Sequence, residues 1–155
     1  FNNTLFVLSA DHTGISNDPF YTNRIGNYSI PILYYMPGSN LKGLDSTFTQ
    51  QIDIMPSILD YLNYPKPYFA FGNSVFDTTA AHYAMTFNTG RYQLLENYYS
   101  TEFTTYKTDL YYYKKDSFLH YNLKAQEKDV MQHMETRIKA IIQTYQQSII
   151  NNKMH

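Results

Sequence analysis

Two short apolar runs constrain the fold of this chain most. They are TLFVLSA at residues 4–10 and IPILYYM at residues 30–36. Apolar runs of this length without polar alternation are typical of strands in a parallel sheet that is covered on both faces. Pro31 is tolerated because it stands near the start of its strand. The first half of the chain is therefore expected to be part of an α/β domain.

The residues around these runs predict a loop and a helix. Residues 11–28 are polar and rich in Gly, Asn and Asp, and we expect a long loop there. Loops of this length without regular structure are uncommon unless they are functional. Residues 51–62 carry apolar side chains four positions apart, with Pro56 near the start, and this spacing predicts a short helix.

The second half of the chain follows a different pattern. Residues 82–95 predict a hairpin in which Gly90 supplies a positive φ at the turn. The segments 98–106 and 110–113 are strand-prone as well. Apolar side chains three or four apart predict a final helix over 123–150. The second half is thus expected to be a small antiparallel sheet backed by a long helix.

This change of pattern divides the chain after residue 78. Residues 1–78 are interpreted as the α/β core portion and residues 79–155 as a C-terminal subdomain. The chain has 17 Tyr and 10 Phe, and most of these rings are expected to pack in the interior.

Charge and composition exclude several classes of function. The net charge is −1 and the longest basic block is Lys114-Lys115, so electrostatic capture of nucleic acid is not expected. Cysteine is absent, which excludes disulfides, thiolate metal sites and a cysteine nucleophile within these residues. There is no HExxH motif, no Gly-rich phosphate loop and no GxSxG elbow. No apolar run approaches the ~20 residues that span a bilayer.

The pair Asp11-His12, which follows the first apolar run, is the main candidate site. A carboxylate and a neutral imidazole together suit Zn²⁺, Mn²⁺ or Mg²⁺. Gly14 permits close approach of the backbone. The ordinary alternative is an Asp that caps the next turn and a His that bonds a neighbouring backbone group. A metal site needs three or four protein ligands or open positions, and further ligands are not evident here.

Other polar residues have weaker claims to a functional role. Arg24 either contacts an anionic group of a substrate or is a solvated loop residue. His82 begins a predicted strand, whereas His133 and His155 are expected to be structural or solvent-facing. No Ser or Thr has a base placed near it in the sequence.

Five segments, in their order and spacing, resemble the sulfatase-like branch of the alkaline phosphatase superfamily. They are NTLFVLSADHTG at 3–14, IPILYYMPG at 30–38, QIDIMPSILDYL at 51–62, GNSVF at 72–76, and DLYYYKKD at 109–116 with Asn122-Leu123. These are similar to the family's strand ending in Asp-His, its V-P…P-G strand, its D-I-x-P-T-L-L helix, its G-x-S-L-F segment and its L-Y-D-L…N-L tail. The segments span most of the chain.

Details within these segments favour one branch of the family. Thr13 separates His12 from Gly14, whereas classical sulfatases have Gly directly after His. The chain therefore resembles most the phosphoglycerol transferases of the lipoteichoic-acid-synthase type. It departs from the family tail at Tyr112, where Asp is usual, and at His120, roughly where Glu is usual.

The resemblance implies a metal site and its chemistry. Asp11 and His12 would ligate a divalent metal, Mn²⁺ in the transferase branch and Ca²⁺ in true sulfatases, with Mg²⁺ and Zn²⁺ also compatible with the two ligands. A further acidic ligand and the nucleophile would lie N-terminal to Phe1: Thr in transferases, a modified Cys or Ser in sulfatases. We therefore expect the C-terminal part of an alkaline-phosphatase-like α/β sandwich domain, which is inactive alone.

The resemblance also implies partners and a location. The substrate would be a sulfate or phosphate ester of an envelope polymer or glycan, and the parent enzyme would face outward at the cell envelope, anchored to the membrane or free. Isolated from its missing N-terminal part, the strand at 4–10 would expose an edge, which favours a homo-oligomer. The alternative reading is a non-catalytic α/β module that binds carbohydrate or protein.

Overall fold

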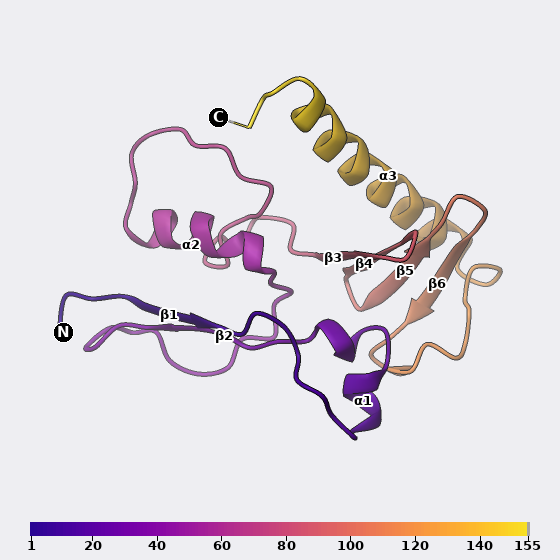
Figure 1. Cartoon of the computed structure of the whole chain (residues 1–155), viewed down its shortest axis with the longest axis horizontal. Helices are drawn as coiled ribbons and strands as arrows, with labels where there is room; N and C mark the ends of the chain where they lie inside the picture. Colours follow the sequence, from indigo (N-terminus) through magenta and orange to yellow (C-terminus); the bar gives the residue numbers. More distant parts are fainter. Residues whose placement is uncertain (155) are drawn as a thin grey trace. The chain divides into compact units, whose positions relative to one another are not determined.

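The computed structural model describes residues 1–154 and has a mixed α/β fold (Figure 1). A two-stranded sheet is followed by a four-stranded antiparallel sheet and a C-terminal helix. The predicted class, small antiparallel sheet and long closing helix are thus confirmed. The chain forms two compact units, an N-terminal unit of residues 1–47 and a C-terminal unit that begins at Phe48.

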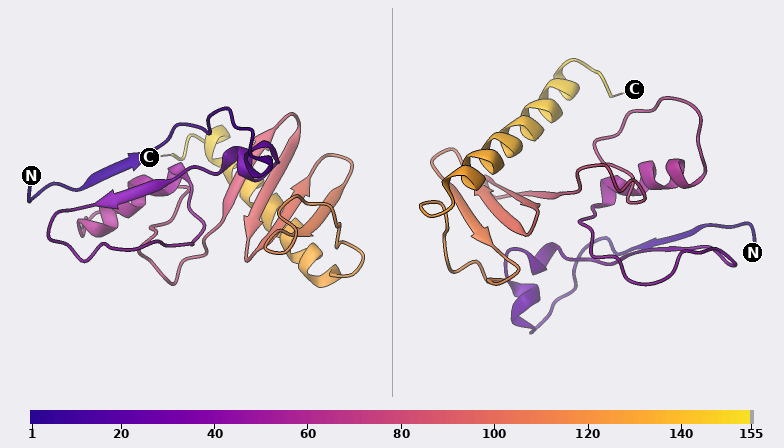
Figure 2. Two further views of the ribbon diagram at one scale, coloured as in Figure 1. Left: turned by 90° about the horizontal axis from the view of Figure 1, so that it is seen from below. Right: turned by 180° about the vertical axis from the view of Figure 1, so that it is seen from behind.

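The sheet of the N-terminal unit contains strands β1 (Phe6–Ser9) and β2 (Ile32–Tyr35), which lie side by side in Figure 2. The strands are antiparallel, with Phe6 opposite Tyr35, so the predicted parallel arrangement is wrong. Leu8 is 56% exposed and Leu33 52%, so the expected cover on both faces is wrong as well. An apolar run reports a tendency to be buried, but it carries no information about the direction of the partner strand.

Two short helices interrupt the predicted loop at 11–28. They are α1 (Pro19–Thr22) and a 3₁₀ helix, η1 (Gly26–Tyr28). The side chain of Asp18 accepts a hydrogen bond from the backbone N–H of Phe20 at 2.8 Å and caps α1, and Pro19 occupies its first position. Asp followed by Pro is a local helix-start signal. The expectation of a loop without regular structure was therefore wrong.

The helix predicted at 51–62 is confirmed. It consists of a 3₁₀ turn, η2 (Gln51–Asp53), continued by α2 (Ile54–Tyr61). Gln50 and Asp53 form a reciprocal capping box at its start, in which each side chain bonds the other residue's backbone N–H. Pro56 lies in the first turn of α2, where its missing N–H costs no intrahelical hydrogen bond.

The four-stranded sheet is an antiparallel meander in the order β3-β4-β5-β6. Its strands are β3 (Ala84–Asn88), β4 (Arg91–Glu96), β5 (Tyr99–Phe103) and β6 (Thr108–Tyr112). Asn88 lies opposite Arg91, and the turn residues Thr89 and Gly90 have φ of 50° and 75°. Both positive values fit the two-residue turn that matches strand twist. The predicted hairpin is confirmed.

Helix α3 (Lys128–Ile150) packs on one face of this sheet (Figure 1). The core consists of Leu94 and Leu110 from the sheet and Met134 and Ile138 from the helix, all at most 2% exposed. Partly buried aromatic rings surround this core. They are Tyr83, Tyr92, Tyr99 and Phe103. Tyr111 is the only buried aromatic residue among residues 1–154 and many other rings are exposed, so the expectation that most rings pack in the interior is wrong.

Helix α3 begins five residues later than the predicted start at 123. The backbone N–H of Leu123 donates to the carbonyl of Leu110 at 2.7 Å, and the side chain of Asn122 accepts from the N–H of Leu110 at 3.3 Å. These bonds tie the segment to β6 and divert its backbone from helical hydrogen bonding.

The C-terminal unit joins α2 to the four-stranded sheet. The side-chain amide of Gln50 donates to the carbonyl of Tyr83 at 2.9 Å and accepts from the N–H of Met85 at 2.8 Å. A compact unit of contacts need not coincide with a functional subdomain, so the division after residue 78 stays a prediction. Within residues 1–154, no helix combines the length and the apolar character needed to cross a membrane.

Candidate metal-binding site

Asp11 and His12 stand immediately beyond the end of β1, as the sequence predicts. The side chain of Asp11 is 87% exposed and that of His12 is 77% exposed. Both side chains are therefore accessible from solvent, and neither serves to fill a core. A strand followed by exposed polar side chains is a usual position for binding residues, because the strand fixes where they stand.

Local hydrogen bonds hold the two side chains. Asp11 Oδ1 accepts from the backbone N–H of His12 at 2.9 Å, and His12 Nδ1 lies 2.8 Å from the carbonyl oxygen of Thr13. The hydroxyl of Thr13 donates to the carbonyl of Asn27 at 2.7 Å. The segment after β1 is thereby fastened to η1. These contacts also match the ordinary alternative of a capping Asp and a His that bonds the backbone.

The other two polar atoms of the pair lie together. Asp11 Oδ2 and His12 Nε2 are 3.4 Å apart. Since a carbonyl accepts and does not donate, Nδ1 must carry the proton of that contact, and in neutral His12 the Nε2 atom is then an acceptor. Two acceptors at this distance repel one another unless a proton or a metal ion accompanies them.

The electrostatics of His12 agree with this arrangement. The carbonyl of Thr13, followed by the charge of Asp11, raises the pKa of His12 above its usual 6.5, against a smaller opposing effect of desolvation. Both favourable contacts stabilise the imidazolium. The pair therefore attracts a positive charge to the position between the carboxylate and Nε2.

The geometry also suits a metal ion. Tetrahedral ligands about 2.1 Å from a common ion lie about 3.4 Å apart, and neighbouring octahedral ligands lie about 3.0 Å apart. The hydrogen bond from Nδ1 to a backbone carbonyl is the usual outer contact of a metal-binding His, because it fixes the tautomer that leaves Nε2 for the metal. Among residues 1–154, no group of three or more His, Cys, Asp or Glu side chains is placed to hold a metal. Asp11 and His12 are thus two candidate ligands, and their binding of a metal stays a prediction.

The remaining histidines make contacts of other kinds. His82 Nε2 lies 2.9 Å from the carbonyl oxygen of Asp77, and the ring of His120 stacks on that of Phe118. His133 is exposed on α3. His155, expected to be structural or solvent-facing, lies outside the described residues.

Arg24 and Gly14 follow the pair along the chain within the N-terminal unit. Arg24 is exposed between α1 and η1, and its predicted contact with a substrate anion stays a prediction. Gly14 has no atom within contact distance of the position that a Cβ would take. No other described segment therefore packs against Gly14, and the close approach of its backbone to a ligand stays a prediction.

A pocket that no motif indicated lies within the C-terminal unit. It is formed by α2 and the loop that follows it, and Pro56, Asp60, Tyr64, Tyr68 and Ser74 are among its lining residues. The aromatic and proline-containing stretch after α2 lies beyond residue 62, where the sequence predicts the helix to end. Whether this stretch lies against a face of α2 depends on how the loop folds back.

Comparisons with known proteins leave the function to be argued from these residues. A scan against protein-family models found no match for the chain, and a search of the solved structures found none either. The features that bear on function are therefore the exposed Asp11-His12 pair and the pocket beside α2.

Proposed function

We propose that this chain is part of a metal-dependent enzyme, similar to sulfatases and phosphoglycerol transferases, and that it supplies two ligands, Asp11 and His12, for a divalent ion. Mn²⁺, Ca²⁺, Mg²⁺ and Zn²⁺ are the candidate ions. One observation carries the proposal: Asp11 Oδ2 and His12 Nε2 lie 3.4 Å apart at the end of a strand, exposed to solvent. That separation fits two ligands of one ion.

The residues of this chain would bind the ion and orient the side chains that hold it. The carbonyl of Thr13 holds the imidazole of His12 through Nδ1, and the N–H of His12 holds the carboxylate of Asp11 through Oδ1. The remaining oxygen and nitrogen would face the ion. A divalent ion bound there supplies screening of an anionic ester and activation of a nucleophile.

The rest of the active site is assigned to another segment of the enzyme. The proposal places the nucleophile and a further acidic ligand there, and names no residue of this chain for either role. The chain alone is then expected to be inactive. The substrate is proposed to be a sulfate or phosphate ester of an envelope polymer or glycan, and the parent enzyme to act at the outer face of the cell envelope.

Paramagnetic broadening by Mn²⁺ tests the ligand assignment. Mn²⁺ added below one equivalent should broaden the backbone amide signals of residues 10–14 before those of other exposed segments. Asp11→Asn and His12→Gln should each raise the Mn²⁺ concentration needed for the same broadening by about tenfold or more, as loss of a metal contact does. His133→Gln removes an exposed imidazole on α3 and serves as the matched control.

Two results would contradict the assignment. One is broadening at residues 10–14 that persists unchanged in both ligand variants. The other is an equal loss in His133→Gln, because that would indicate nonspecific attraction of the cation by exposed side chains.

A further inference from the structure

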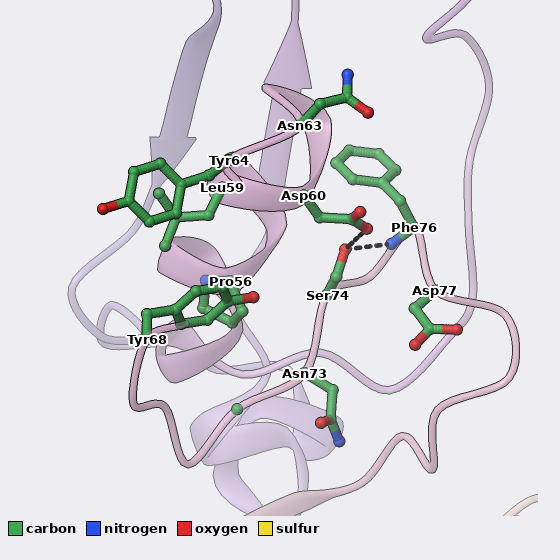
Figure 3. A pocket seen from close by; sticks show the side chains of 11 residues that line it. Pro56, Leu59, Asp60, Asn63, Tyr64, Tyr68, Asn73, Ser74, Phe76 and Asp77 are labelled. Atoms are coloured by element: carbon green, nitrogen blue, oxygen red, sulfur yellow. Dashed lines mark hydrogen bonds between the residues drawn. The ribbon is translucent and has the colours of Figure 1, made fainter. Parts of the chain in front are cut away.

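A pocket of about 470 Å³ lies between one face of α2 and the loop that follows the helix (Figure 3). Pro56, Leu59, Asp60 and Asn63 are spaced three or four positions apart, or adjacent, and line it from the helix side. Residues of the loop from Tyr64 to Asp77 line the rest. The volume is within the range of small-molecule sites, which run from about 300 to 1,000 Å³.

One side of the pocket is aromatic. Tyr64 and Tyr68 are each 46% exposed, and their ring centroids are 6.4 Å apart with the planes inclined by 58°. Pro56 and Leu59 add apolar surface beside them. The face of an aromatic ring is electron-rich and attracts the weakly positive C–H groups of a ligand. This side therefore suits a ligand that has an apolar C–H face.

The other side of the pocket carries polar side chains, among them Asp60, Ser74 and Asp77, beside the ring of Phe76 (Figure 3). The hydroxyl of Ser74 donates to Asp60 Oδ2 at 2.5 Å, which orients the carboxylate and leaves acceptor capacity on its other oxygen. The side-chain amide of Asn63 makes no hydrogen bond in the part of the chain that the structure describes. Together these groups offer both acceptors and donors to a ligand that has hydroxyl groups.

The charges in the pocket decide against an anionic ligand. Asp60 and Asp77 both line it, and of the residues that the structure describes no Lys, Arg or His lines it, although His82 lies 2.9 Å from the carbonyl oxygen of Asp77. Two carboxylates in the lining repel a phosphate or sulfate group. The pocket therefore differs in ligand class from the proposed ester site at Asp11 and His12.

Partly buried hydrogen bonds hold the loop against α2. Asp53 Oδ1 accepts from the N–H of Asn73 at 2.9 Å, and the hydroxyl of Ser57 accepts from the N–H of Val75 at 3.0 Å. A Cβ on Gly72 would collide with Asp53 and with the backbone of Ile52, so glycine is needed for this close approach. A loop held by two hydrogen bonds and one close backbone approach between residues 72 and 75 keeps the polar side of the pocket formed before a ligand arrives.

We infer that this pocket binds one uncharged pyranose ring of a saccharide, which stacks on Tyr64 and Tyr68 and hydrogen-bonds to Asp60 and Asn63. A pyranose places an apolar C–H face next to a rim of hydroxyl groups that both donate and accept. These two features correspond to the two sides of the pocket. The site does not require the metal proposal, because none of its residues belongs to the Asp11-His12 pair.

Saturation-transfer NMR on the whole chain tests this, with methyl glucoside, methyl galactoside and methyl N-acetylglucosaminide as probes and EDTA present throughout. At least one of the three should bind, with a dissociation constant of about 1 mM, the value expected of a ligand of this size. The double variant Tyr64→Ala with Tyr68→Ala should weaken that binding fivefold or more. Tyr106→Ala removes an exposed ring elsewhere in the same unit and should change it less than twofold.

A second variant and two charged probes complete the test. Asp60→Asn preserves the shape of the side chain and should also weaken binding fivefold or more, which keeps the test valid if the double variant loses its fold by circular dichroism. Glucose 6-phosphate should bind more weakly than the neutral glucoside. The inference is overturned if none of the neutral glycosides binds, if the folded variants keep wild-type affinity, or if glucose 6-phosphate or choline binds more tightly than every neutral glycoside. Because EDTA is present, failure here is separate from failure of the metal assignment.

Discussion

Replacing Asp53 by alanine should destabilise the C-terminal unit strongly. Asp53 is 4% exposed, and its carboxylate accepts from the N–H of Gln50 at 2.7 Å and from the N–H of Asn73 at 2.9 Å. The first bond caps the start of the helix formed by η2 and α2. The second holds the loop that lines the pocket. One short side chain thus connects the start of a helix to a loop 20 residues further along the chain.

The size of the effect follows from the two donors that Asp53→Ala leaves behind. A buried donor without its acceptor costs about 1–3 kcal/mol, so two cost about 2–6 kcal/mol. In the wild type, burial of the charged carboxylate costs free energy. Its removal therefore offsets part of the loss caused by the two donors. We therefore expect the free energy of unfolding to fall by about 2–4 kcal/mol. Asp53→Asn keeps one acceptor oxygen and should lose about half as much.

Urea unfolding followed by circular dichroism measures this loss, with Asp129→Ala as the control. Asp129 is an exposed acidic residue in the first turn of α3, and its replacement should cost no more than about 1 kcal/mol. Amide hydrogen exchange at Asn73 should also accelerate in Asp53→Ala. The reasoning is refuted if Asp53→Ala unfolds at the same urea concentration as the wild type or the control.

The pH dependence of this effect has a definite sign. Burial raises the pKa of Asp53 above its usual 3.8, although the hydrogen bonds from Gln50 and Asn73 oppose the shift. A carboxyl whose folded pKa is raised contributes most stability below about pH 3.8 and loses it as the pH rises through the folded pKa. The stability difference between wild type and Asp53→Ala should therefore shrink as the pH rises through that window. A difference that grows would contradict the dominance of burial.

Two further predictions concern the core and the β1–β2 sheet. Leu94→Ala should reduce the free energy of unfolding by about 2–5 kcal/mol, because Leu94 is fully buried against Leu110, Met134 and Ile138; urea unfolding that shows less than 1 kcal/mol would exclude it from the core. Among residues 1–154 no third strand joins the β1–β2 sheet, and Leu33 on β2 is exposed, so the mass by light scattering should rise with concentration; Leu33→Lys should reduce that rise. A constant monomer mass would contradict the expected homo-oligomer.

Several elements were predictable because their signals lie within a few residues. Side chains four apart and Pro56 in the first turn indicated the helix at 51–62, and Gly90 between two strand-prone segments indicated the hairpin. The periodic apolar positions of α3 indicated its buried face, of which Met134 and Ile138 form the core. Signals of this kind act through local geometry, which the sequence specifies directly.

The predictions were wrong where a contact between distant residues determined the local structure. The start of α3 moved because Leu123 bonds the carbonyl of Leu110 on β6. The direction of β1 relative to its neighbour depended on which strand pairs with it. It pairs with β2 in the antiparallel direction. The short helix α1 was the exception, since the Asp18-Pro19 start signal was local and available in the sequence.

By itself, the sequence determined that an acid and an imidazole follow a strand, because adjacent residues remain adjacent in any fold. The contacts within the pair are local too, since Asp11 Oδ2 lies 3.4 Å from His12 Nε2 and Nδ1 contacts the carbonyl of the adjacent Thr13. The tertiary structure decided that both side chains stay exposed and that Thr13 is hydrogen-bonded to Asn27, 14 residues further along the chain. The pocket beside α2 was decided by tertiary structure alone. Its two sides come from a helix face and a loop pinned by Asp53 and Ser57, and a hydrogen bond between residues 20 positions apart has no local signature in a single sequence.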